Sequence, residues 1–189
     1  MSRNDSLPLG LALLLLGVGV AGITFMSIAE PDVSYARTLW TAALALILAT
    51  PAIALYVLEE GLPGRWWRAF WTVGLLAYLA HFWWAVFRSY NGDFGAIIAR
   101  QQWVAYTNFA VTILWTLDVI LAWAAPGSAA TMRIALRFVT WAGVTVSFLM
   151  ASAFFRTGTI ATLGFALAAI IAVALLLRYF RLVRWANYP

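Results

Sequence analysis

The sequence predicts an all-α, polytopic integral membrane protein with six transmembrane helices and both termini in the cytoplasm. Of the 189 residues, 65% are hydrophobic and only 10% are charged, which is far more apolar than an ordinary water-soluble domain. Six apolar runs reach the length of about 20 residues that a helix needs to cross the hydrocarbon core of a bilayer. A water-soluble globular fold is therefore excluded.

The first three spans are predicted at residues 7–29, 38–58 and 69–90. The first run is longer than the roughly 7–15 apolar residues of a secretory signal core, so we interpret it as a span and not as a cleaved signal. The second contains Pro51, which removes one backbone N–H group and predicts a kink in mid-span. The third is rich in tryptophan and carries the single histidine, His81.

The last three spans are predicted at residues 103–125, 134–155 and 159–180. Residues 91–102 separate them from the first three, and Asp93 there predicts the cap of a short helix at the membrane interface. Small residues recur at four-residue spacing in the fifth span and in the first, which permits close helix approach: Gly143, Ser147, Ala151, Gly17 and Ala21. No interval is long enough for a soluble domain, so residues 1–189 are predicted to form one transmembrane domain.

Arginine supplies all 12 basic residues, and its distribution predicts the orientation. Eight arginines fall on the side of the amino terminus, and cytoplasmic loops are the ones enriched in positive charge: Arg3, Arg65, Arg68, Arg133, Arg137, Arg178, Arg181 and Arg184. The tail from Arg178 to Tyr188 alternates arginine with aromatic residues, which predicts a membrane-surface anchor. Arginine-only basic usage with abundant alanine favours a bacterial source, hence the bacterial plasma (inner) membrane.

Few residues offer enzymatic chemistry. There is no cysteine and only one histidine, so we predict no metal site. Phosphate-binding loops, the zinc-protease helix motif and a serine elbow are absent, and no pair of carboxylates is placed to cooperate. The arginines stand singly between apolar runs, which is not the pattern of a nucleic-acid surface. We therefore expect no catalytic activity of the chain itself.

Two ionisable residues, His81 and Asp118, lie deep in predicted spans. A charged side chain is costly to place there, so each of them predicts either a bonding partner or a functional role. At 100° per residue, Asp118 shares one stripe of its helix with Asn108 and Thr112. In the structural interpretation, Asn108 and the threonines bond to neighbouring helices and Asp118 pairs with Arg137, which lies at a similar depth. In the alternative, Asp118, His81 and Tyr78 line a proton or cation path.

His81 also predicts a second type of site. It shares a helical face with Tyr78, Trp84 and small residues, which leave room for a flat ring to approach. A quinone, a tetrapyrrole pigment or a haem could bind there, although structural lipids alone are the simpler expectation. A hydrogen bond from a buried histidine to another helix is the other interpretation of the same residue.

The 11 tryptophans are more numerous than a membrane-interface belt explains. Trp83, Trp84, Trp115 and Trp141 lie deeper, where such rings fill gaps, contact another subunit or flank a ligand. Together with the near absence of extramembrane chain, this predicts a non-catalytic accessory subunit of a larger, energy-transducing membrane complex. Its partners would be the bilayer and other integral membrane subunits. A small transporter or channel, and a quinone, pigment or haem binder at His81, are the alternatives.

Overall fold

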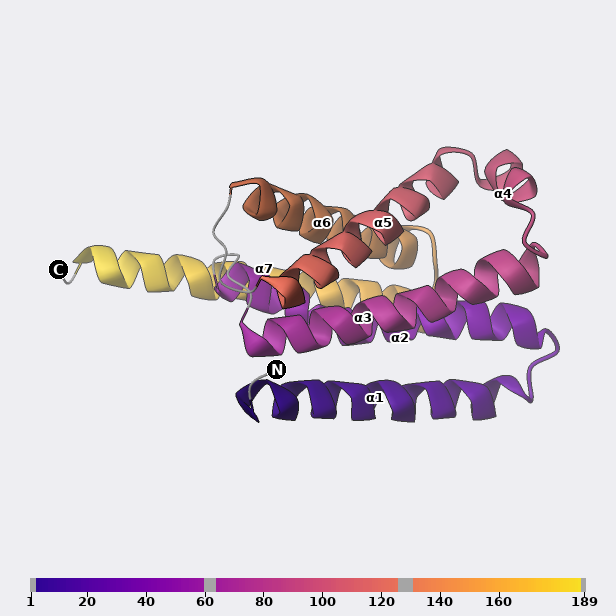
Figure 1. Cartoon of the computed structure of the whole chain (residues 1–189), viewed down its shortest axis with the longest axis horizontal. Helices are drawn as coiled ribbons and strands as arrows, with labels where there is room; N and C mark the ends of the chain where they lie inside the picture. Colours follow the sequence, from indigo (N-terminus) through magenta and orange to yellow (C-terminus); the bar gives the residue numbers. More distant parts are fainter. Residues whose placement is uncertain (1–2, 60–63, 126–130, 188–189) are drawn as a thin grey trace.

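The computed structural model describes residues 3–59, 64–125 and 131–187, and every element within these ranges is helical. Six helices are long and apolar enough to span a membrane, as expected of a multi-pass membrane protein. They alternate in direction, so the first and the last described helix have their chain ends at the same end of the bundle (Figure 1). Glu60 and Pro126, which follow the predicted second and fourth spans, and the tail residue Tyr188 lie outside the described residues.

The six spans agree with the predicted ones to within a few residues at most ends. The elements, in chain order, are α1 (Arg3–Ser27), α2 (Val33–Leu58), α3 (Arg65–Trp83) with its π-helical continuation η1 (Trp84–Ser89), α4 (Phe94–Gln101), α5 (Trp103–Ala124), α6 (Thr131–Leu149) with its π-helical continuation η2 (Met150–Phe154), and α7 (Gly158–Asn187). The largest difference is at the last helix, which continues beyond the predicted end at residue 180 and projects past the bundle (Figure 1).

α2 begins five residues before the predicted residue 38 because Asp32 caps it. The Asp32 carboxylate accepts a hydrogen bond of 2.9 Å from the backbone N–H of Tyr35, one of the first N–H groups of the helix that no helical carbonyl can reach. The short helix predicted after Asp93 is confirmed as α4, since Asp93 Oδ1 accepts from the backbone N–H of Ala96 in the same way.

Replacement of Asp32 by alanine is expected to destabilise the protein by about 1 kcal/mol, because the capped N–H group then loses its acceptor. Thermal unfolding in detergent measures this loss. Asp32→Asn keeps a capping oxygen and is the control, expected to stay within a few tenths of a kcal/mol of the original chain. Equal destabilisation by both substitutions would contradict the capping role.

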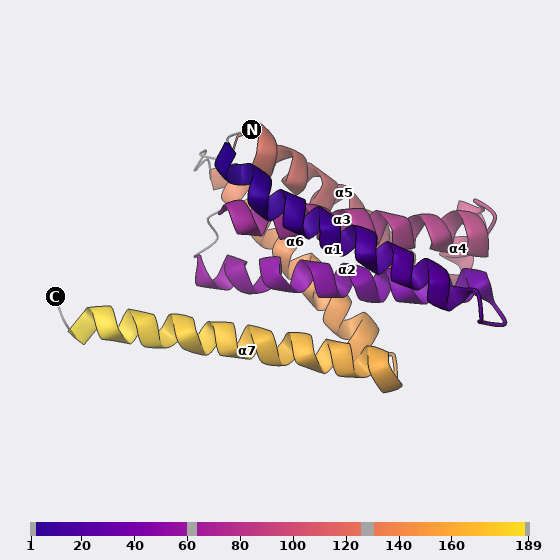
Figure 2. The same cartoon turned by 90° about the horizontal axis from the view of Figure 1, so that it is seen from below.

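The core of the bundle lies between α2 and α3, which run side by side along their length (Figure 1). They approach each other closely at Gly74, where an added Cβ would lie 2.9 Å from the Cβ of Ala49 and 3.1 Å from its Cα. α1 covers one side of this pair. α7 runs along α2, while α6 crosses toward the start of α7 and packs with α5 (Figure 2).

The end of α2 near the chain termini is capped by arginine side chains of α7. Arg178 Nη1 donates to the carbonyl of Val57 at 3.5 Å, and Arg181 Nη1 donates to that of Leu58 at 3.4 Å. Cations are favourable there, because the last carbonyls of a helix lack helical partners and carry partial negative charge. Glu59 follows directly; partial burial raises the pKa of its carboxyl, and a hydrogen bond from Gly64 opposes that rise.

α2 continues through Pro51 as an α-helix, and the hydroxyl of Thr50 donates within this helix, to the Leu46 carbonyl. Gly17, one of the predicted small-residue positions, faces open space, since a Cβ there would meet nothing within 4 Å. Close approaches to another backbone occur at Gly74 and at Gly164, where a Cβ would lie 2.6 Å from the backbone nitrogen of Ala153.

Candidate functional site

The buried charges form one cluster between α3, α5 and α6. Asp118 and Arg137 are 1% and 5% exposed, and Arg137 Nε lies 3.5 Å from Asp118 Oδ1. The second carboxylate oxygen of Asp118 accepts a 2.9 Å hydrogen bond from Trp71 Nε1. The guanidinium of Arg137 also lies 5.4 Å from the ring centroid of Trp67, a cation–π distance. The carboxylate is therefore held by a cation and an indole N–H, as a buried charge requires.

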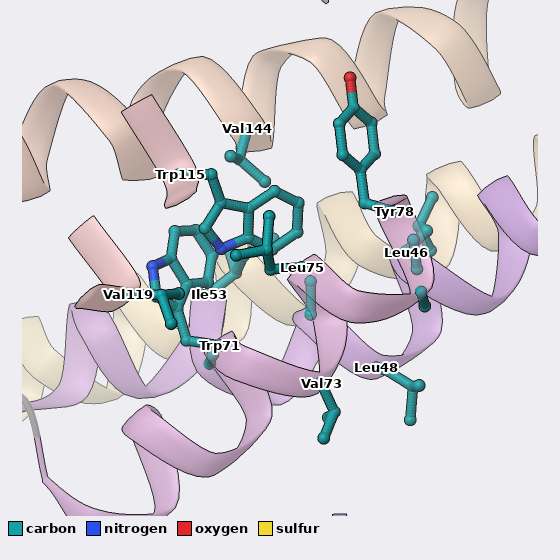
Figure 3. Close-up of a cluster of buried hydrophobic side chains, with 14 of the residues drawn as sticks. Leu46, Leu48, Ile53, Trp71, Val73, Leu75, Tyr78, Trp115, Val119 and Val144 are labelled. Atoms are coloured by element: carbon teal, nitrogen blue, oxygen red, sulfur yellow. The ribbon is translucent and has the colours of Figure 1, made fainter. Parts of the chain in front are cut away.

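A column of aromatic rings extends from this cluster into the bundle (Figure 3). Trp71 and Trp115 have ring centroids 4.7 Å apart, and Trp115 and Tyr78 have centroids 5.6 Å apart. Trp67, Trp71 and Trp115 are fully buried within the chain. Trp141 also has an internal partner, because its Nε1 donates to the carbonyl of Ile53 at 3.1 Å. Two of the four deeper tryptophans, Trp115 and Trp141, thus pack inside this chain.

His81 lies beyond Tyr78, at a centroid distance of 5.8 Å, in the half of the bundle away from the chain termini. Its Nδ1 lies 2.8 Å from the backbone carbonyl oxygen of Thr38 on α2. The hydrogen bond from a histidine to a neighbouring helix, predicted as one interpretation, is therefore present. Because a carbonyl oxygen can only accept, Nδ1 must carry the proton.

His81 and Tyr78 line a cavity of about 220 Å³ in this half of the bundle. Its walls come from α2, α3, α5, α6, η2 and α7, and most of the lining is aliphatic or aromatic: Leu39, Ala42, Ala43, Leu46, Val111, Trp115, Val144, Phe148, Ala151, Ile160 and Leu163. The π-helical segment η2 contributes the end of the α6 wall. Tyr35 and Arg156, both exposed, lie at the end of the cavity away from the chain termini, and Arg156 Nη1 donates to the Tyr35 hydroxyl at 2.9 Å.

Three polar side chains of the lining have hydrogen-bonding capacity that no described residue satisfies. They are Asn108 on α5, Ser147 on α6 and, through Nε2, His81 on α3. The backbone carbonyl of Asn108 does accept, from the Tyr78 hydroxyl at 3.4 Å, but its side-chain amide has no partner among the described residues. Polar groups from three helices thus meet at one apolar cavity.

The structure separates the predicted cofactor-site residues. Trp84 is not in the described lining of the cavity; the guanidinium of Arg37 lies 5.0 Å from its ring centroid instead. Arg37 in turn donates from Nε to the hydroxyl of Ser27 at 2.9 Å. Trp84 therefore belongs to a contact between the ends of α1, α2 and α3. Of the three predicted cofactor-site residues, only His81 and Tyr78 line the cavity.

The predicted polar stripe of α5 faces the protein at Asn108 and Asp118, and its Thr112 has partners in two helices. The Thr112 hydroxyl donates to the carbonyl of Asn108 at 2.7 Å, within its own helix, and Thr112 is also a side-chain hydrogen-bond partner of Tyr78 on α3. The bond within α5 is the usual one, because a threonine hydroxyl in a helix reaches the carbonyl three or four residues earlier. Thr107 does the same with Val104 and is exposed.

The structure does not bring His81 and Asp118 together. Asp118 is absent from the described lining of the cavity, and the rings of Tyr78, Trp115 and Trp71 stand between the two residues. A proton or cation path through both would need polar groups where the described structure has aromatic rings. The two deep ionisable residues therefore belong to two separate sites.

Sequence reasoning missed Thr38, Ser147 and Arg156 as residues of this site. Ser147 appeared only as a member of a small-residue series, although the space that small residues leave also accommodates a cavity. Thr38 takes part through its backbone, which no side-chain pattern reveals. Arg156 is one of the four arginines outside the predicted cytoplasmic set, and nothing in its sequence context marks it as a site residue.

Comparison of the chain with protein-family models, with curated proteins and with solved structures gives no match. The function proposed below therefore depends on the chemistry of the site alone.

Proposed function

We propose that this protein binds a small amphiphile with one polar ring, of the quinone class, in the cavity beside His81. The observation that carries the proposal is that polar groups of His81, Asn108 and Ser147, which have no partner among the described residues, converge on a single apolar cavity. Away from water, an unpaired polar group costs several kcal/mol. A ligand with hydrogen-bonding groups at its edges would satisfy these side chains, while its apolar parts contact the remaining walls.

The cavity suits one ring rather than a macrocycle. An apolar protein cavity of roughly 150 Å³ takes up benzene, so about 220 Å³ accommodates a single ring with substituents. A tetrapyrrole joins four rings and would have to extend well beyond this space. Tyr78, Trp115 and Phe148 present aromatic surface to the cavity, and Tyr78 and Phe148 meet edge to face at 6.4 Å, which favours a flat ring as ligand.

The location of the cavity fits a ligand that enters from the bilayer. It lies in the half of the bundle away from both chain ends, near Arg156. With the termini in the cytoplasm of a bacterium, as the arginine distribution predicts, this half belongs to the outer leaflet of the plasma membrane. An alkyl tail could stay among the lipids while the ring occupies the cavity.

The test measures binding of a short-chain alkyl benzoquinol and of its quinone to the purified full-length chain. Binding is detected as a rise in the midpoint of thermal unfolding, which a ligand of the folded state produces. Ser147→Leu places an apolar side chain at the cavity and is expected to weaken binding about tenfold or more. Val146→Leu makes the same kind of change at the adjacent position, which is 57% exposed, and should leave binding unaltered.

Binding that survives Ser147→Leu in a chain of normal stability would contradict the proposal. So would the absence of any midpoint rise in the original chain with both probes, which would indicate that ordered water alone satisfies the polar groups.

The role of accessory subunit in a larger membrane complex stays a prediction. Trp83 and Trp103 are the features that favour it, because they are 47% and 64% exposed on the surface of the bundle. The particle extracted gently from its own membrane would then have a mass well above 20.8 kDa and would contain other subunits. A lone chain or a homo-oligomer would exclude it.

A further inference from the structure

The hydrogen bond of His81 to α2 determines what the other side of the imidazole can do. Nδ1 donates to the Thr38 carbonyl at 2.8 Å. A neutral imidazole carries one N–H, so Nε2 is left with a lone pair and can only accept. Arg156 is the single charged residue in the described lining, and no acidic residue there would stabilise a second proton on the ring. His81 therefore presents an acceptor to a ligand.

The other two polar side chains do not discriminate between ligand groups in this way. The amide of Asn108 both donates and accepts, and the hydroxyl of Ser147 can rotate to do either. Each can bond to a carbonyl oxygen or to a hydroxyl of the ligand. Only His81 distinguishes the two groups. A ligand hydroxyl can donate to Nε2, whereas a carbonyl oxygen has no hydrogen to donate and would place its lone pairs next to that of Nε2.

We infer, on the basis of the function proposed above, that the cavity selects the hydroxyl form of its ring ligand, a quinol, over the corresponding quinone. A site that forms a hydrogen bond to a hydroxyl leaves a polar group unpaired when the hydroxyl is missing, and the affinity falls accordingly. The quinol bonds through one hydroxyl to His81 Nε2, and its second oxygen is free to meet Asn108 or Ser147.

The experiment compares three ligands with the same ring and the same short alkyl chain: the quinol under anaerobic conditions with excess reductant, the quinone, and the dimethyl ether of the quinol. The ether keeps the shape but has no hydroxyl hydrogen. The quinol is expected to bind to the full-length chain about tenfold more tightly, or better, than either of the others. Equal affinities for the three would overturn the inference and leave the proposed binding function standing, whereas binding of none of them would overturn both.

Two variants test which residue causes the preference for the quinol. In His81→Leu the quinol and the quinone should bind with affinities within about threefold of each other, because the acceptor has gone. In Asn108→Leu both affinities should fall while the preference for quinol persists, since His81 is intact. This second variant still decides the question if His81→Leu fails to fold through loss of the bond to α2. A preference abolished in Asn108→Leu would assign the discrimination to Asn108 and contradict the role of His81.

Discussion

Replacement of Arg137 by methionine is expected to destabilise the bundle by about 3–5 kcal/mol, because it leaves the carboxylate of Asp118 buried without its cation. The two side chains are almost inaccessible and lie 3.5 Å apart. Methionine fills much of the same volume, so the loss measures the charge more than the packing. Thermal unfolding in detergent and the share of monodisperse protein after extraction are the measurements.

The double variant Arg137→Met with Asp118→Asn is expected to recover about half of this loss or more. Asparagine removes the charge but keeps an oxygen that can accept from Trp71 Nε1. Arg133→Met is the matched control one turn earlier on α6. Among the described residues its guanidinium bonds only to the Ala125 carbonyl, at 3.2 Å, so a change below about 1 kcal/mol is expected. Single variants whose effects simply add in the double variant would show that no coupled ion pair exists.

Replacement of Gly74 by alanine is expected to destabilise the protein by about 1–3 kcal/mol, since the added methyl group overpacks the contact between α2 and α3. The new Cβ would lie 2.9 Å from the Cβ of Ala49 and 3.1 Å from its Cα. A Cα belongs to the backbone and cannot rotate away, so the two helices must separate. The same thermal unfolding measurement detects the change.

Gly17→Ala on α1 is the control for Gly74→Ala. A Cβ at Gly17 meets nothing within 4 Å, and alanine is the better helix former by about 1 kcal/mol. This variant should therefore be neutral or slightly more stable. If Gly74→Ala behaved like Gly17→Ala, the close approach of α2 to α3 would be contradicted.

The candidate site illustrates what a sequence pattern can and cannot indicate. The depth of Asp118 and Arg137 in their spans was enough to predict a pair, because a buried charge selects a partner at the same depth. The depth of a residue in its span does not indicate whether Trp84 or Ser147 lies at the same cavity as His81. Trp84 shares a helical face with His81, whereas Ser147 reaches the same cavity from another helix, 66 positions further along the chain.

The sequence by itself determined the six long apolar helices, the short helix capped by Asp93 and the arginine-rich end of α7, because the length of an apolar run and the chemistry of a helix cap are local properties. The tertiary structure decided which faces meet. Because each helix is apolar on almost every face, its sequence hardly indicates which face packs inside the bundle. Contacts such as that of Gly74 with Ala49 depend on how closely the two helix backbones approach. For the same reason only the folded bundle brings His81, Asn108 and Ser147 to one cavity and turns Nδ1 of His81 toward Thr38.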